Sequence, residues 1–191
     1  MKDFFTLPKD LPVPEDDGAC AHLPGKDMPG LALASTAGRM VRLDEQAQSR
    51  TVFFFYPRSG RPGESIPAAW DQIPGARGCT PHSCAYRDHY GEFQQLRTAV
   101  FGVSSQDTPY QQEFARRTSL PYEILSDEAF KLTEALRLPT FVFEGKRLIK
   151  RLALVAERGR IVKVFYPVFP PDKNAETVLA WLKQAPGSGV A

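Results

Sequence analysis

Residues 51–56 read TVFFFY, a short run of β-branched and aromatic side chains with no polar alternation. Such a run is typical of a strand buried on both faces of a sheet. Pro57 ends it. Residues 99–104, AVFGVS, predict a second buried strand. Residues 79–96, which lie between the two, predict a helix because aromatic and aliphatic side chains recur there at helical spacing, namely Tyr86, Tyr90, Phe93 and Leu96.

A strand, a helix and a second strand in this order predict parallel pairing through a crossover helix. The remaining predicted elements are a hairpin at 31–34 and 39–43, a helix at 108–119 with Thr108 as its cap, a strand at 122–125, a helix at 128–136, two or three strands within 140–164, and a helix at 174–182 capped by Asn174. The order predicts an α/β chain with a central mixed sheet flanked by helices, and a thioredoxin-like fold is the simplest architecture that fits it.

The chain is long enough for one well-packed domain, with 191 residues of which 42% are hydrophobic. We predict an extended leader at 1–30, a thioredoxin-like domain at 31–184 and a flexible tail at 185–191. The net charge of +2 comes from interspersed signs, which does not favour a polyanion-binding protein. No apolar run is long enough to span a membrane, and the first residues lack the apolar core of a secretory signal, so we expect a cytoplasmic protein.

Cys79 follows a long loop, residues 58–78, and opens a predicted helix. A loop of this length inside a compact domain is uncommon and usually has a function. A cysteine in the first turn of a helix faces unpaired backbone N–H groups and the positive end of the helix dipole, which favour the reactive thiolate. Cys84 lies five residues later, which in a helix means about 7.5 Å of rise. A disulfide needs Cα atoms within about 7 Å, so the two cysteines can pair only if the first turns unwind.

Two other interpretations of these residues remain open at this point. A free cysteine is often only a small buried apolar residue. Cys79, His82 and Cys84 also offer three metal-ligating side chains, although zinc sites usually show a second ligand cluster in the sequence. The odd, low count of three cysteines, including Cys20 in the leader, argues against a secreted disulfide scaffold.

Residues 78–93, GCTPHSCAYRDHYGEF, resemble the peroxiredoxins, and within them the PrxQ or bacterioferritin-comigratory-protein group. The blocks FFFYPR, VFGVSSQDT and LPYEILSD resemble other parts of that family in the same order. The resemblance implies a thiol-dependent peroxidase that reduces hydrogen peroxide or organic hydroperoxides without a metal or an organic cofactor. It also implies that Cys79 is the peroxidatic cysteine, that Cys84 resolves its sulfenic acid as an intramolecular disulfide, and that thioredoxin or a similar dithiol recycles the protein, as a monomer or homodimer.

The family's active-site arginine arrives on a later strand, and Arg151 matches it. Two departures from the family pattern stand out. Ala76 occupies the position of the family's active-site threonine, so Thr80 or Ser59 would have to supply the hydroxyl. The family's proline is matched by Pro57, which lies 22 residues before Cys79, or is replaced by Pro74. Residues 138–150 are additional, and we expect them to form an inserted strand on the sheet edge.

Other residues of this region are assigned ordinary roles. We expect Arg87 and Asp88 to form a local ion pair, His82 to be solvated and Cys20 to have no catalytic part. Trp70, in the long loop, would line the pocket mouth or a contact surface. The alternative functions are a thiol-disulfide oxidoreductase or redox sensor that uses the same cysteine pair, and a binding domain without activity. Disulfide exchangers favour two residues between their cysteines, which makes the peroxidase the preferred interpretation.

Overall fold

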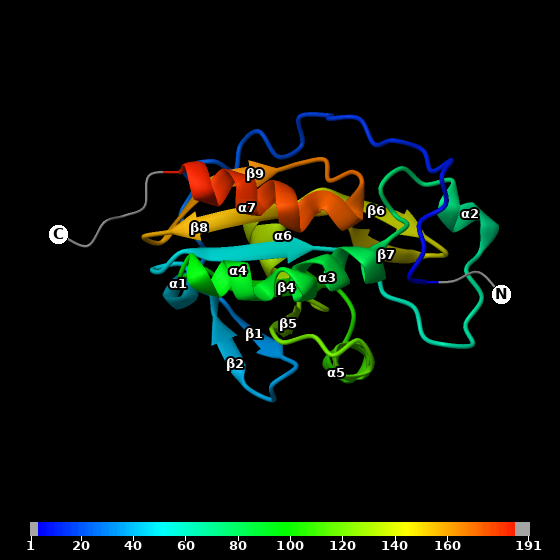
Figure 1. Ribbon diagram of the computed structural model, residues 1–191, viewed down its shortest axis with the longest axis horizontal. Coiled ribbons are helices and arrows are strands. Elements are labelled where there is room, and N and C mark those ends of the chain that lie inside the picture. The colour runs from blue at the N-terminus through cyan, green and yellow to red at the C-terminus, as the bar shows by residue number, and fades with distance from the viewer. Residues whose placement is uncertain (1–3, 186–191) are drawn as a thin grey trace.

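The structure is a computed structural model that describes residues 4–185. Its centre is a seven-stranded sheet in the order β2-β1-β5-β4-β3-β8-β9 (Figure 1). The central strands β3, β4 and β5 are parallel to one another, and the outer strands pair antiparallel. The mixed α/β sheet confirms the predicted fold class.

The strands and helices fall close to their predicted positions. The strands of the main sheet are β1 Ala32–Ser35, β2 Met40–Arg42, β3 Thr51–Phe55, β4 Ala99–Ser104, β5 Glu123–Ser126, β8 Leu152–Glu157 and β9 Arg160–Phe165. The helices are α1 Leu43–Gln46, α2 Ala68–Asp71, α3 Cys79–Asp88, α4 Tyr90–Gln95, α5 Thr108–Arg117, α6 Lys131–Leu136 and α7 Asn174–Gln184, with a 3₁₀ turn at Pro171–Lys173.

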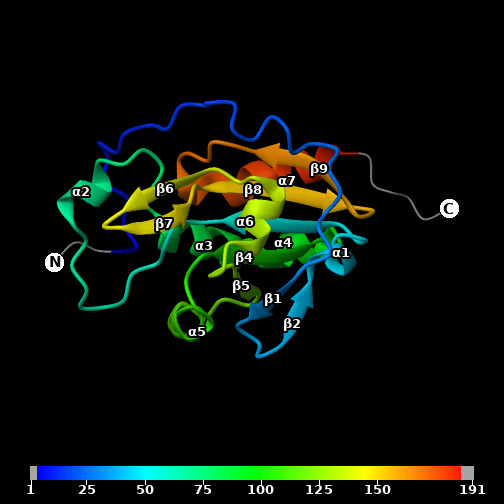
Figure 2. The same ribbon diagram turned by 180° about the vertical axis from the view of Figure 1, so that it is seen from behind.

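Strand β3 is buried along its whole length, as its apolar run predicted. Because successive strand residues point to opposite faces, Phe53 and Phe55 belong to one core layer, and Phe54 and Tyr56 to the other. Helices α3, α4, α5 and α7 pack on the layer of Phe54, while α1, α6 and part of the leader pack on the other (Figures 1 and 2).

Three local predictions were wrong in detail. The single helix predicted over residues 79–96 is broken at His89, whose backbone leaves the helical region between α3 and α4. The cap of α5 is Asp107, whose carboxylate accepts from the Tyr110 N–H, and not Thr108. Asn174 is the first residue of α7, but its side chain does not cap that helix.

The additional residues after α6 form a separate two-stranded sheet, β6 Thr140–Phe143 and β7 Lys146–Ile149, and not an edge strand of the main sheet. This hairpin packs against the long loop of residues 58–78. Trp70 of α2 meets Phe143 edge to face, with ring centroids 5.0 Å apart, and Ala76 and Leu148 complete the small core. The long loop and the additional hairpin are therefore partners of each other.

The leader runs along the molecule from the α2 end to the start of the edge strand β9 (Figure 1). Residues 25–28 hydrogen-bond to the backbone of Gly159 and Ile161. Near its beginning, Phe4 and Leu7 lie against Gly60 and Gly78. Within residues 4–185, no helix has the length and apolarity needed to cross a membrane. Most of the predicted flexible tail, from residue 186 onward, lies outside the described residues, and the domain limits stay a prediction.

Candidate active site

Cys79 is the first residue of α3, and Gly78 before it sets the geometry of the helix start. Gly78 has φ of 100°, which L side chains rarely adopt, and its carbonyl accepts the first helical hydrogen bond from the His82 N–H at 2.9 Å. A β-carbon at this position would stand 2.5 Å from the ring of Pro171. The close approach of the 3₁₀ turn therefore requires glycine, and the start of α7 that follows this turn contacts α3 at His82 and Tyr86.

Arg151 holds the sulfur of Cys79 from the other side. It lies just before β8, is only 3% exposed, and its Nη2 donates to Cys79 Sγ at 3.2 Å. The same guanidinium donates to the carbonyls of Gly75, Ala76 and Arg77, which form the end of the long loop. No carboxylate of the described residues pairs with Arg151. Among the described residues, the side chains that contact this buried guanidinium are those of Cys79 and His82.

His82, one turn into α3, contacts Arg151 as well. Its Nδ1 lies 2.8 Å from Arg151 Nη1 and its Nε2 lies 3.0 Å from Asn174 Oδ1. The Tyr86 hydroxyl donates to the same Asn174 oxygen at 2.7 Å. Complete burial, and then the charge of Arg151, hold the pKa of His82 well below its usual range. The prediction of a solvated histidine was therefore wrong.

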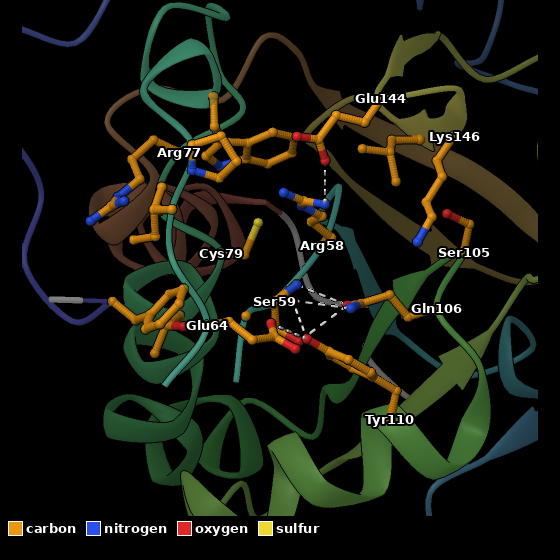
Figure 3. Close-up of a pocket in the computed structure, with 18 of the residues that line it drawn as sticks. Arg58, Ser59, Glu64, Arg77, Cys79, Ser105, Gln106, Tyr110, Glu144 and Lys146 are labelled. Carbon is orange, nitrogen blue, oxygen red and sulfur yellow. Dashed lines mark hydrogen bonds and ion pairs between the residues drawn. The ribbon is translucent and has the colours of Figure 1, made fainter. Parts of the chain in front are cut away.

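Cys79 opens into a cavity of about 800 Å³ at the end of the molecule that carries α2 and the β6–β7 hairpin (Figure 3). Arg58 forms part of the wall, with its guanidinium 4.6 Å from the Trp70 ring centroid and 3.8 Å from Glu144. Across the cavity, Ser59 donates to Gln106 Oε1, and the Tyr110 hydroxyl donates to the Ser59 carbonyl. Cys79 is 5% exposed and faces this partly polar pocket, not a sealed interior.

The family model described as Redoxin matches residues 23–179, which is most of the chain. The chain belongs to the redoxin family. Peroxiredoxin Q of Arabidopsis thaliana, a chloroplastic protein, is 30% identical over 84% of this chain and 67% of its own length. Chloroplastic peroxiredoxin Q of Gentiana triflora is 27% identical over 97% of this chain and 80% of its own. This redoxin is a PrxQ-like peroxiredoxin and a thiol-dependent peroxidase.

Solved structures agree on the fold. Peroxidoxin BcpB from Mycobacterium tuberculosis superposes with a TM-score of 0.70 at 25% identity, covering 86% of this chain and 99% of that one. Peroxiredoxin Q from Xanthomonas campestris superposes with a TM-score of 0.65, covering 92% of this chain and 97% of that one, and at 22% identity it supports the fold alone.

The structure brings three of the four predicted site residues of this peroxiredoxin together. Cys79 and Arg151 are in contact, and Thr80 lines the cavity beside Cys79 while being 2% exposed. Ser59, the other candidate hydroxyl, also lines the cavity, but it already donates to Gln106. Both candidate hydroxyls therefore lie at the cavity that Cys79 faces. Pro57 is buried just before the lining residue Arg58, whereas Pro74 lines a second hollow beneath the leader.

Cys84 lies farther along α3 and does not reach Cys79. Both cysteines are free thiols in this state, and the helix between them is intact. Burial raises the pKa of the Cys84 thiol, although Arg87 opposes the shift. The predicted ion pair of Arg87 with Asp88 is confirmed at 2.8 Å. While α3 stays folded, burial therefore disfavours the thiolate form of Cys84.

Cys20 belongs to the core layer on the face of the sheet opposite Cys79, and burial raises its pKa to about 12. Among residues 4–185, no three His, Cys, Asp or Glu side chains are grouped as metal ligands would be. Both nitrogens of His82 are already engaged. The geometry around Cys79 suits a nucleophile next to a fixed cation.

Sequence reasoning missed the residues that lie around the contact between Cys79 and Arg151. Asn174 was interpreted as a helix cap and Tyr86 as part of an apolar stripe, yet both converge on His82. The contact between His82 and Asn174 joins residues 92 positions apart. No local pattern carries a signal for such a pair, because it depends on how the last helix packs on α3.

Proposed function

We propose that Cys79 is the peroxidatic residue of this enzyme and that Arg151 and Thr80 assist it. The Cys79 thiolate attacks one peroxide oxygen, an S–O bond forms, and the O–O bond breaks. The departing alkoxide or hydroxide takes a proton and leaves as alcohol or water, and Cys79 becomes a sulfenic acid. The observation that carries this assignment is the 3.2 Å contact of Arg151 Nη2 with the sulfur at the mouth of the cavity.

Arg151 and the helix start have distinct parts in this step. The fixed guanidinium N–H groups stabilise the thiolate and the charge that develops on the oxygens as the O–O bond lengthens. The first turn of α3 adds backbone N–H groups without partners within the helix. The Thr80 hydroxyl is available to hydrogen-bond the incoming peroxide. A preorganised site of this kind needs no reorganisation at the moment of reaction.

We propose that Cys84 completes the turnover as the resolving residue. Its sulfur attacks the sulfenic sulfur of Cys79, an S–S bond forms and water leaves. Both cysteines lie in one ten-residue helix, so the beginning of α3 has to unwind before they meet. A dithiol of the thioredoxin type then takes over the disulfide and restores both thiols. The intramolecular disulfide and a cytoplasmic site of action are parts of the same proposal.

The test combines peroxide kinetics with disulfide mapping. Stopped-flow consumption of hydrogen peroxide and of cumene hydroperoxide is compared for the wild type, Cys79→Ser, Cys84→Ser and Cys20→Ser. We expect Cys79→Ser to be inactive and Cys20→Ser to match the wild type. Cys84→Ser should complete one turnover and accumulate sulfenic acid. Fast consumption that survives Cys79→Ser would contradict the assignment. A Cys79–Cys20 crosslink in the mass spectrum of the oxidised protein would contradict the role of Cys84.

A further inference from the structure

The Arg151 guanidinium is held by a buried chain of hydrogen bonds that passes through the first residue of the last helix. Arg151 Nη1, His82, Asn174 and the Tyr86 hydroxyl follow one another at 2.8, 3.0 and 2.7 Å. His82 and Tyr86 have no exposed surface, and Asn174 is 4% exposed. Polar groups buried to this degree are costly unless each finds its partner. The chain is complete from the helix α7 start to the sulfur of Cys79.

The donors and acceptors of this chain allow only one protonation state. A guanidinium has no acceptor, so His82 Nδ1 must present a lone pair to Arg151. The hydrogen of the neutral ring is then on Nε2 and is donated to Asn174 Oδ1. The same Asn174 oxygen also accepts from the Tyr86 hydroxyl, so both lone pairs of that oxygen are used. A protonated His82 would place a second N–H against the Arg151 guanidinium.

We infer that His82 is a positioning residue for peroxide reduction, which aims the Arg151 guanidinium at Cys79 through the hydrogen bond from Nη1 to Nδ1. The inference rests on the proposed role of Cys79. The three backbone carbonyls that Arg151 also contacts lie on the long loop, whereas His82 lies on the same helix as the nucleophile. His82 is thus the acceptor that fixes the cation relative to the sulfur itself. Asn174 sets the tautomer of His82, because its Oδ1 accepts the hydrogen on Nε2.

The test replaces the acceptor while keeping the volume. His82→Leu removes both hydrogen bonds but keeps an apolar side chain beneath the Phe54 ring, which lies 4.9 Å from the imidazole. His82→Gln retains one acceptor and one donor. His89→Leu is the matched control, because His89 lies at the end of the same helix and pairs with Glu92 at the surface. Thermal unfolding monitored by circular dichroism shows which variants are folded.

Two rates are measured, one of which does not involve peroxide. The first is the second-order rate of Cys79 oxidation by hydrogen peroxide, and the second is the rate of Cys79 alkylation by iodoacetamide across pH, which reports the thiolate fraction. For His82→Leu we expect an oxidation rate about 10- to 100-fold lower, as for other small displacements of a catalytic group, and alkylation that needs higher pH. His82→Gln should recover most of both rates, and His89→Leu should match the wild type.

A double-mutant cycle tests whether His82 acts through Arg151. In an Arg151→Met background, the additional His82→Leu change should alter neither rate, because the group that it positions is gone. Equal rates for folded His82→Leu and wild type would overturn the inference. So would an additive effect in the cycle, or failure of folded His82→Gln to recover. If Cys79 were not the nucleophile, the alkylation rates could still change while peroxide consumption did not, which separates the two failures.

Discussion

At the residue scale, the reactivity proposed for Cys79 rests on its contact with a guanidinium that has no carboxylate partner among the described residues. Arg151 is buried, and its neighbours are three carbonyls, one imidazole and the sulfur. Its charge is therefore directed at Cys79 and is not neutralised by an acidic side chain. This differs from Arg77 nearby, which pairs with Asp71 at 3.4 Å. The two buried arginines beside the end of the long loop thus have different partners, because Arg151 contacts the Cys79 sulfur and Arg77 contacts a carboxylate.

Replacing Arg151 by methionine removes the cation while keeping most of the side-chain volume. We expect the rate of peroxide reduction to fall by about 100- to 1,000-fold, the usual loss for one fixed donor to a developing negative charge. Stopped-flow oxidation of Cys79 measures it. Arg160→Met, which removes an exposed arginine paired with Asp27, is the control and should retain full activity. A folded Arg151→Met protein with wild-type rates would show that the contact with sulfur is not catalytic.

His82 also makes stability depend on pH. Its pKa is held well below the ordinary 6.5 in the folded protein by burial and by Arg151. Below pH 6.5 the unfolded chain therefore binds a proton that the folded chain does not, so the free energy of unfolding falls as pH decreases, by up to about 1.4 kcal/mol per pH unit. Urea unfolding between pH 7 and pH 5 should show this slope. For His82→Gln, the free energy of unfolding should depend less steeply on pH, by the equivalent of about one bound proton. An unchanged slope would contradict the buried neutral imidazole.

At the scale of elements, the start of α3 is fixed by one glycine and one turn of the C-terminal region. Gly78 supplies the left-handed conformation and the space for Pro171. A β-carbon would meet the proline ring, which cannot rotate away. Gly78 and Pro171 thus lie next to the helical turns that must unwind in the proposed disulfide step. In that proposal, the stability of this helix start separates the peroxide step from the resolving step.

Gly78→Ala tests this arrangement. We expect the free energy of unfolding to fall by about 2–4 kcal/mol, from the unfavourable φ together with the overlap at Pro171. Gly91→Ala is the control, because Gly91 lies in α4 with no atom within 4 Å of the added carbon. There alanine should be neutral or stabilising by up to about 1 kcal/mol. Urea denaturation of both variants measures the difference, and equal stabilities would contradict the close packing at Gly78.

The sequence determined these elements unevenly, for physical reasons. The run of residues 51–56 and the AVFGVS strand are local patterns, and both strands formed where expected. The break at His89 was not visible, because the aromatic spacing continues through it and both short helices bury the same face. Cys79 and Arg151 could be predicted from motifs. His82 and Asn174 could not, since their roles exist only when α7 and the Pro171 turn pack against α3.

At the scale of the whole molecule, the cavity is assembled from segments that are distant in the sequence. The leader contributes Phe4, the long loop contributes Trp70, and the β6–β7 hairpin contributes Leu148. The loop and the hairpin share a small core that is separate from the two main layers. Each of the two segments lacks a partner in the seven-stranded sheet. Their joint effect is to extend a wall beyond the reactive sulfur, so that a substrate larger than hydrogen peroxide would contact it.

This arrangement predicts a difference between small and large peroxides. Trp70→Ala removes the aromatic centre of the wall, where the indole ring contacts Phe141, Phe143 and the Arg58 guanidinium. In the proposed mechanism hydrogen peroxide contacts only Cys79, Thr80 and Arg151, so its rate should stay within about threefold of the wild type. For cumene hydroperoxide, KM should rise by about tenfold, the effect of losing one or two apolar contacts in a pocket.

Val142→Ala is the matched control for that change, because Val142 lies on the same hairpin and is 68% exposed. It should leave both substrates unchanged. Steady-state kinetics with the two peroxides give the ratio of kcat/KM values for each variant. Equal losses for both peroxides in Trp70→Ala would mean that the wall supports the catalytic loop and does not contact substrate. In that case the ratio of the two kcat/KM values would not change, because a displaced Arg151 slows the reaction of every peroxide alike. The loss of an apolar surface, by contrast, affects only a substrate that is large enough to contact it.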